Sequence, residues 1–396
     1  MIKISDDHFI TGNLETIEND VTPIIKQLNS TGLPLDIGIV EKIRNQYLDH
    51  QRECSDKIFE LAGYKFDLGR KSQIESALKQ EGFKIGKSAN KLVMDRLTRE
   101  GSSLAALIKE YRQLQRVSAN GLSLINFYDH FSKKLLPIWH QNKALTGRIL
   151  SEGPCVSNIS KPYREAIKED GYKFVYFDFR NFELRIQASL TSDPVLIEMF
   201  NNNFDLHTYT ASLILNKNSA EIEPDERKKY KSISLGYWYG MGVEGIVYRT
   251  GLQRSLVKKI TDTLDQKFHV LRSRVTEFEK EAKDKGFAET PWGRKMYKDA
   301  KYGYWALLAQ ATASDYFKFI LVQVAEKLPE LILSAPLFDG GLYKIKNDQQ
   351  KIKNIMGELN EIASQKIEGF CKMAVDIGFG NSWQEAVQKT CAFDIK

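Results

Sequence analysis

A run of charged and aromatic residues from Arg227 to Gly240 constrains the fold of this chain more than any other segment. If the run is helical, four side chains recur every fourth residue and lie on one helix face; these are Arg227, Lys231, Leu235 and Tyr239. At ~1.5 Å rise per residue they form a stripe about 18 Å long. The two cations could bind the phosphates of a nucleotide, and the flat apolar end could pack against its base. A solvated basic helix start that leads into an aromatic core segment fits the run equally well.

Length and composition are those of an ordinary soluble globular protein. A chain of 396 residues is too long for one simple core, so we expect two or three domains or subdomains. Apolar residues make up 42% and charged residues 27% of the chain, which are ordinary values. The formal net charge of +6 permits a polyanionic partner but does not require one.

Cysteine spacing and hydropathy argue against several protein classes. The four cysteines are scattered without a Cys-x-x-Cys pair, so the sequence indicates neither a zinc site nor a disulfide framework. The N-terminal segment lacks the apolar run of a signal peptide. No apolar segment approaches the ~20 residues that a membrane span needs. We therefore expect a reduced, cytoplasmic compartment and no membrane partner.

Hydrophobic periodicity predicts mostly helices and a few short strands. Apolar residues recur at three- and four-residue spacing from residue 21 to about 135, which predicts helices. Further helical patterns cover 183–200, 205–285 and 349–370. Strands are predicted for the apolar runs at 174–179, 332–338, 342–345 and 373–377. The middle two would form a hairpin, because Asp339-Gly340-Gly341 between them is a turn signal.

Two aspartates, Asp178 and Asp339, follow strand-like runs. A carboxylate at the end of a strand is rigidly placed and still meets solvent. If the two strands are neighbours, the pair could share two Mg²⁺ ions, which lie ~3.5–4 Å apart in two-metal sites. Mg²⁺ suits a few carboxylates plus substrate phosphates, and Mn²⁺ could serve as well. Each Asp taken alone could equally be a turn or capping residue.

Taken in chain order, these segments resemble the motifs of the family A DNA polymerases, the bacterial DNA polymerase I class. The family's first motif, Asp-Tyr-Ser-Gln-Ile-Glu-Leu-Arg, is similar to Asp178-Phe-Arg-Asn-Phe-Glu183-Leu-Arg185. Its second motif, Arg-x3-Lys-x3-Phe-Gly-x2-Tyr-Gly, matches the run from Arg227 to Gly240. Shorter matches are Thr146-Gly-Arg148, Asp205-Leu-His207-Thr, Glu289-Thr-Pro-Trp-Gly-Arg294 and Asn381-Ser-Trp383-Gln-Glu-Ala386. Because several motifs occur in the same order as in the family, together they outweigh the purely structural interpretation of each motif taken alone.

The resemblance implies an α+β fold of the right-hand polymerase type, with thumb, palm and fingers. The palm is expected to be an antiparallel sheet flanked by helices, and the thumb and fingers to be mainly helical. The implied ranges are 1–20 for an N-terminal extension, 21–145 for the thumb, 146–204 and 300–396 for the palm, and 205–299 for the fingers. With only about 20 residues before the thumb, we expect neither an exonuclease domain nor nuclease activity.

The resemblance also implies roles for single residues in a templated DNA polymerase. Two Mg²⁺ ions would be bound by Asp178, Asp339 and the backbone of Phe179, and Lys231 would join the two aspartates in catalysis. The nucleotide would contact His207, Arg227, Lys231, Leu235, Tyr239 and Glu183, the last of which would exclude a ribose 2′-hydroxyl. DNA would contact Arg148, Asn158, Gln310, Gly240 and Arg294. The implied partners are primer–template DNA and dNTPs, bound by a monomer of bacterial, phage or plasmid type.

The chain departs from the family pattern near the predicted site. The family's third motif, His-Asp-Glu, is here Phe338-Asp339-Gly340, and the Phe of the second motif is Leu235. Ser234, Ala306 and Tyr302 replace an Asn, an Asn and an Arg. We therefore expect weaker mismatch discrimination. A template-independent or otherwise specialised nucleotidyltransferase remains an alternative, as does a non-catalytic binding protein, although retention of both aspartates argues against the latter.

Overall fold

The computed structural model describes residues 13–85, 89–202, 204–238, 240–297, 303–365 and 369–392. The chain divides into two compact units, and each is described by itself. The first unit contains Met1–Leu33, Pro137–Ser157 and Lys168–Lys396; the second contains Pro34–Leu136 and Asn158–Ile167.

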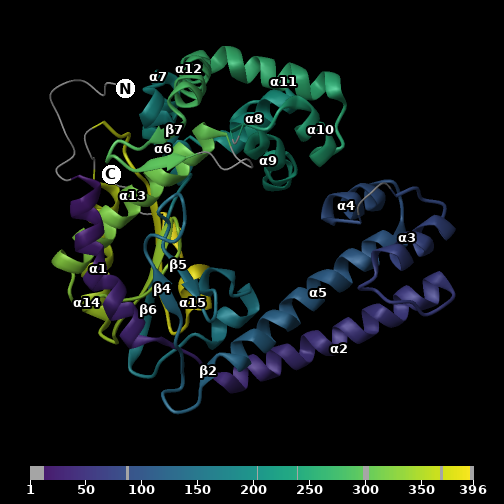
Figure 1. Ribbon diagram of the computed structural model, residues 1–396, viewed down its shortest axis with the longest axis horizontal. Coiled ribbons are helices and arrows are strands. Elements are labelled where there is room, and N and C mark those ends of the chain that lie inside the picture. Colours follow the sequence, from purple (N-terminus) through teal and green to yellow (C-terminus); the bar gives the residue numbers. More distant parts are fainter. Residues whose placement is uncertain are drawn as a thin grey trace. The chain divides into compact units, whose positions relative to one another are not determined.

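An antiparallel five-stranded sheet lies at the centre of the first unit (Figure 1). Its strands, in the order β12-β11-β6-β10-β9 across the sheet, are β12 (Cys391–Ala392), β11 (Val375–Gly380), β6 (Tyr172–Phe179), β10 (Gly340–Lys346) and β9 (Ile332–Pro336). The four predicted strands therefore exist, and they form one sheet. The expected α+β class with an antiparallel sheet and many helices is confirmed.

Alternation of side chains along β6 gives the sheet two different faces. Phe177 and Phe179 point to one face, where their rings lie 6.3 Å from Phe317 and 6.0 Å from Tyr316 of α13 (Tyr304–Lys327). In Figure 1, α13 and α14 (Gln349–Ser364) lie on one side of the sheet and α15 (Trp383–Gln388) lies on the other. Gly378 of β11 permits the close approach of α15, because a Cβ there would lie 2.2 Å from a carbonyl oxygen of that helix.

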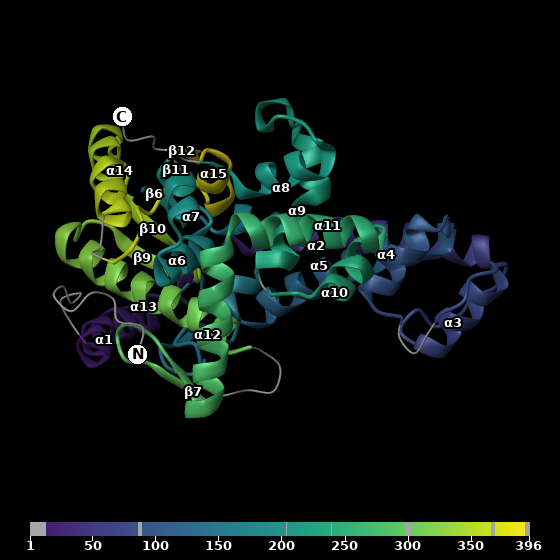
Figure 2. The same ribbon diagram turned by 90° about the horizontal axis from the view of Figure 1, so that it is seen from above.

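Helices make up most of the remaining first unit (Figure 2). They are α1 (Leu14–Thr31), α6 (Phe182–Thr191), α7 (Pro194–Asn201), α8 (Leu206–Leu215), α9 (Pro224–Trp238), α10 (Val243–Thr250), α11 (Arg254–Lys267) and α12 (His269–Lys285). Two small hairpins complete the unit, β4 (Ile138–His140) with β5 (Leu150–Glu152) and β7 (Phe287–Glu289) with β8 (Lys295–Tyr297). Helix α9 packs against α8 and α10, and α12 packs against α13.

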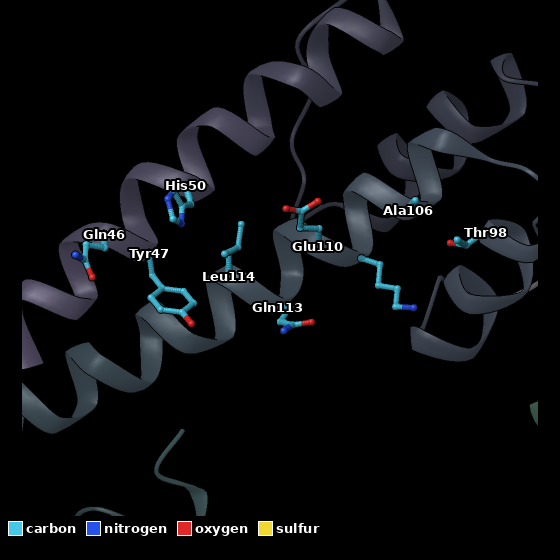
Figure 3. A pocket seen from close by; sticks show the side chains of 9 residues that line it. Gln46, Tyr47, His50, Thr98, Ala106, Glu110, Gln113 and Leu114 are labelled. Carbon is cyan, nitrogen blue, oxygen red and sulfur yellow. The ribbon is translucent and has the colours of Figure 1, made fainter. Parts of the chain in front are cut away.

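The second unit is built on two long helices, α2 (Ile37–Ala62) and α5 (Ser103–Asn126), which pack along each other. It also contains α3 (Lys71–Gln80), α4 (Lys91–Arg99) and the hairpin of β2 (Tyr128–Asp129) with β3 (Lys134–Leu135); β1 (Leu33–Pro34) precedes α2. Figure 3 shows Tyr47 and His50 of α2 and Glu110 of α5 around an open groove of about 460 Å³. None of the residues that line this groove belongs to the predicted site.

Several predicted element boundaries were wrong. Gly340 and Gly341 are not in a turn but begin β10, so the turn is formed by the three residues before them. The helix predicted for 183–200 is two helices, because Ser192 adopts a left-handed φ of 51° and Asp193 caps α7. The helix predicted for 349–370 ends at Ser364. Residues 128–135, predicted as helical, include the β2–β3 hairpin.

The compact units do not follow the predicted subdomain ranges. Helix α1 lies inside the predicted thumb range 21–145 for most of its length, yet it packs against α13 in the first unit. The predicted fingers and most of the predicted palm fall into that same unit, whereas residues 158–167 of the palm range belong to the second unit. Which residues act as thumb, palm and fingers therefore stays a prediction. Among the described residues, no helix combines the length and the hydropathy needed to cross a membrane.

Candidate active site

The structure brings the two predicted metal-binding aspartates together at one end of the sheet. Asp178 lies near the end of β6, directly across from Gly340 in the pairing with β10. Asp339 precedes Gly340, and its carbonyl oxygen accepts a hydrogen bond from the N–H of Phe179 at 2.7 Å. The two aspartates therefore occupy neighbouring backbone positions, Asp178 in β6 and Asp339 in the turn just before β10, which sequence alone does not reveal.

Gly340 lies where the family's third motif has Glu, and the structure explains why a glycine is needed. A Cβ at this position would lie 2.2 Å from the carbonyl oxygen of Phe177 and 3.0 Å from the Cα and Oδ1 atoms of Asp178. Strands β6 and β10 thus approach too closely for any side chain here. This strand pairing therefore leaves no room for the glutamate that the family motif has at this position.

An arginine and a glutamate surround Asp339. The guanidinium of Arg148 forms an ion pair with Glu183, in the first turn of α6, and lies 5.3 Å from the ring centre of Phe338. Burial raises the pKa of Asp339; the positive charge of Arg148 opposes this shift and the negative charge of Glu183 adds to it. A buried carboxylate with an incompletely compensated charge is stabilised by a nearby cation.

The residues present fit divalent ions that bind together with a phosphorylated substrate. Within the described part of the chain, no three His, Cys, Asp or Glu side chains form a complete cation cage. Mg²⁺ is commonly bound by one or two carboxylates plus substrate phosphates, with water in the remaining positions. Asp178 and Asp339 could provide two such carboxylates.

Helix α9 confirms the predicted helical conformation of the basic run as far as Trp238. Arg227, Lys231 and Leu235 therefore share one helix face. Arg227 forms an ion pair with Asp205, whose side chain also caps α8. Lys231 is exposed and Leu235 is half-buried. Tyr239 lies outside the described residues, and Gly240 follows the helix with a left-handed φ of 74°.

His207 is buried behind this face and has a specific partner. Only 4% of its surface is exposed, and its Nδ1 atom lies 2.8 Å from the hydroxyl oxygen of Ser234 on α9. Burial lowers the pKa of His207 to about 4; the positive charges of Lys231 and Arg227 lower it further, and Asp205 opposes them. The imidazole is therefore neutral at pH 7. Sequence reasoning noted Ser234 only as a departure from the family pattern and missed this pairing.

Neutral His207 makes stability depend on pH. With an ordinary pKa of 6.5 and a folded pKa of about 4, the folded chain binds fewer protons than the unfolded chain between these values. Its contribution is complete above pH 6.5 and is lost as the pH falls toward 4. The free energy of unfolding should fall by about 2 kcal/mol between pH 7 and pH 5 through this group.

Urea unfolding at the two pH values tests this expectation. The pH-dependent loss should shrink by that amount in His207→Asn and remain in His50→Asn, which alters an exposed histidine of the second unit. Equal acid sensitivity of the wild type and His207→Asn would contradict the assignment.

A model of the family described as DNA polymerase family A matches residues 38–385, which is most of the chain. The chain belongs to DNA polymerase family A. DNA polymerase I of Thermus thermophilus is 23% identical over 94% of this chain and 48% of its own length. DNA polymerase I of Pseudomonas aeruginosa is 24% identical over 94% of this chain and 44% of its own length. The chain thus spans about half the length of these curated relatives.

A solved structure shares the fold of this family A chain. It is described as the POL domain of Pol1 from M. smegmatis in complex with DNA primer-template and dNTP. The TM-score is 0.82, and the match covers 93% of this chain and 70% of the other at 21% sequence identity. The likeness establishes a common architecture.

The remaining predicted DNA contacts of this family A chain lie in different environments. Gln310 is half-buried on α13, and Asn158 is exposed in the second unit. Arg294 is only 8% exposed. Its guanidinium is paired with Asp315 at 2.8 Å and also with Glu18, so it is occupied by protein carboxylates. A direct DNA contact for Arg294 stays a prediction that this pairing does not favour.

The pairing of Arg294 belongs to a buried charge cluster that sequence reasoning missed. Lys318 of α13 donates to Glu18 of α1 at 2.5 Å and to the carbonyl oxygen of Gln141 at 2.9 Å. Thr290 donates to Asp315 at 2.8 Å. Asp315 and Lys318 interrupt an otherwise uncharged stretch of α13, and that interruption was the available signal.

The cluster also fixes the turn that carries Arg148. A Cβ on Gly147 would lie 2.3 Å from the guanidinium carbon of Arg294, so the turn rests directly on this side chain. Gly147 has a left-handed φ of 69°, which glycine adopts without strain. Arg294 therefore supports the candidate site through the Thr146-Gly147-Arg148 turn.

Proposed function

We propose that this chain is a DNA-templated DNA polymerase that adds dNTPs to the 3′-hydroxyl of a primer. The observation that carries the proposal is that Asp178, in β6, lies beside Asp339, in the turn before β10, where the N–H of Phe179 donates to the carbonyl oxygen of Asp339. Membership of family A and the fold shared with a polymerase domain solved with primer-template DNA and dNTP support the proposal.

Asp178, Asp339 and the backbone of Phe179 would bind two Mg²⁺ ions, with Mn²⁺ as a substitute. Such ions would activate the primer hydroxyl and stabilise charge on the transferring phosphate. The primer 3′-oxygen forms a bond to the α-phosphorus as the bond to the β-phosphate oxygen breaks, and pyrophosphate leaves. The 3′-hydroxyl proton passes to solvent.

Helices α8 and α9 would bind the nucleotide. Arg227 would exchange its ion pair with Asp205 for one with a phosphate, and Lys231 would neutralise the leaving pyrophosphate. Neutral His207 carries a single ring N–H; with Nδ1 accepting from the hydroxyl of Ser234, it would donate from Nε2 to a phosphate oxygen of the nucleotide. Leu235 and Tyr239 would pack against the base and sugar.

The surroundings of the sugar and of the primer end would determine selectivity. Glu183, oriented by Arg148, would exclude a ribose 2′-hydroxyl. The DNA would be contacted by Arg148, Asn158, Gln310 and Gly240. Arg294 would support the turn that carries Arg148. Loss of the family's polar residues beside Asp339 supports reduced fidelity, because fewer groups would sense the primer end.

Primer extension by the pure protein with Mg²⁺ tests the proposal. Parallel reactions contain primer–template with dNTPs, the same DNA with rNTPs, and single-stranded primer alone. We expect growth to the template's end with dNTPs only. Growth of the lone primer, or efficient use of rNTPs, would show a specialised nucleotidyltransferase instead. No growth in any reaction would refute polymerase activity by this chain.

A further inference from the structure

Arg180 lies two residues after Asp178, and the proposed polymerase reaction gives its side chain no role. The family's first motif has Ser at this position. Its backbone N–H donates to the carbonyl oxygen of Ala374 at 2.8 Å, which fixes the start of the side chain next to β11. The side chain is 26% exposed, so a ligand can reach it.

Asp376 orients Arg180 from the neighbouring strand. In the pairing of β11 with β6, Asp376 is directly across from Asp178. Residues directly opposite each other in an antiparallel pair project to the same face, so both carboxylates belong to the face that α15 partly covers. One carboxylate oxygen of Asp376 lies 3.0 Å from the Nε atom of Arg180. Burial raises the pKa of Asp376, and the charge of Arg180 opposes that shift.

This ion pair uses one edge of the guanidinium and leaves the other edge for a ligand. Arginine carries five N–H donors, and a phosphate binds two of them at once. Arg180 makes no hydrogen bond from its two terminal amino groups to any residue that the structure describes. Because Asp376 shares a sheet face with Asp178, the guanidinium that Asp376 contacts lies beside that face as well.

The proposed reaction brings phosphates to this place. Ions bound to Asp178 and Asp339 would be shared with phosphate oxygens of the nucleotide. Paired residues on antiparallel strands have Cα atoms roughly 4.5–5.5 Å apart, so Asp376 and its arginine lie one strand spacing from Asp178. A guanidinium at this distance is within reach of the same triphosphate.

We propose that Arg180 binds the β- and γ-phosphates of the incoming nucleotide and the departing pyrophosphate, and that Asp376 is the positioning residue that orients it. This inference rests on the proposed polymerase function. It gives the chain a phosphate-binding cation on the palm sheet, in addition to Arg227 and Lys231 on α9.

Equilibrium binding without chemistry tests the role of Arg180. The full chain is bound to a template with a dideoxy-terminated primer, and Ca²⁺ replaces Mg²⁺. The Kd values for the next dNTP, for pyrophosphate and for the primer–template are then measured. Arg180→Ser should weaken dNTP and pyrophosphate binding by about 10- to 100-fold, as expected for loss of a charge-assisted hydrogen bond, and leave primer–template binding unchanged.

Three further variants separate positioning from general damage. Arg180→Lys should recover part of the affinity, because it keeps the charge but loses the two-pronged geometry. Asp376→Asn should weaken dNTP binding by a smaller factor and raise the KM for dNTP more than it lowers kcat. Lys173→Ser removes a cation from the far end of the same strand and should change none of the three Kd values.

The outcomes distinguish this inference from the proposed function. Unchanged dNTP binding in Arg180→Ser, with tight binding by the wild type, would overturn the role of Arg180 alone. Weakened primer–template binding with normal dNTP binding would assign Arg180 to the DNA backbone instead. If Arg180→Ser does not fold, the comparison of wild type with Arg180→Lys decides, and equal affinities would refute the two-pronged phosphate contact. A wild type that neither binds dNTP nor extends primers would refute the polymerase proposal itself.

Discussion

Asp178→Asn is expected to abolish nucleotide incorporation, lowering its rate on the order of 10³-fold or more, because preorganised charge supplies the largest share of such catalysis. Asn keeps the shape of the side chain but removes the charge that would bind the metal ions. Asp178 is half-buried at the end of β6, so the fold should remain. Single-nucleotide incorporation rates measure the loss, and Mn²⁺ binding followed by electron paramagnetic resonance gives a readout independent of activity.

Asp170→Asn is the matched control. Asp170 is exposed just before β6, so the same chemical change there should leave both incorporation and Mn²⁺ binding as in the wild type. An Asp178→Asn protein that retains activity within about tenfold of the wild type would exclude Asp178 as a principal metal ligand. Lost activity with unchanged Mn²⁺ binding would assign this carboxylate a role other than metal binding.

Asp315→Ala is expected to lower the free energy of unfolding by about 3–5 kcal/mol. The side chain of Asp315 is fully buried and accepts hydrogen bonds from Arg294 and Thr290. Its removal leaves Arg294 with one carboxylate, Glu18, which must also neutralise Lys318. An uncompensated buried cation costs far more than a lost surface pair.

Urea unfolding of the wild type and of Asp315→Ala at pH 7 measures this loss. Asp284→Ala, an exposed position on α12, is the control and should change stability by less than about 0.5 kcal/mol. Because Arg294 supports the turn of Arg148, Asp315→Ala should also weaken primer–template binding under conditions where the protein stays folded. Stability equal to that of the control would show that the cluster tolerates one missing charge.

Sequence patterns predicted the elements whose signals are local. Four-residue spacing identified α9, and apolar runs identified β6 and β11, because each pattern depends on residues a few positions apart. The motifs, taken in chain order, predicted the α+β fold class. The pattern could not show that Asp178 and Asp339 meet, since strand pairing depends on packing across the whole first unit.

Predictions failed where tertiary contacts overrode local signals. Gly340 was predicted as a turn residue, but it serves a close approach between β6 and β10. The partnership of His207 with Ser234 joins two helices, and no spacing rule encodes it. The burial of Arg294 follows from carboxylates on α1 and α13, which its motif does not reveal. Its DNA contact stays a prediction.

The order of strands in the central sheet has a consequence for how the protein is made. Strand β6 is flanked by β10 and β11, both of which follow it by more than 150 residues along the chain. Such pairings have high contact order and form slowly. A chain leaving the ribosome would expose Asp178 and could complete α9 well before its second aspartate had been synthesised. Shorter chains would therefore contain α9 but not the pair of aspartates, so the proposed metal site could form only after β10 and β11 have been synthesised.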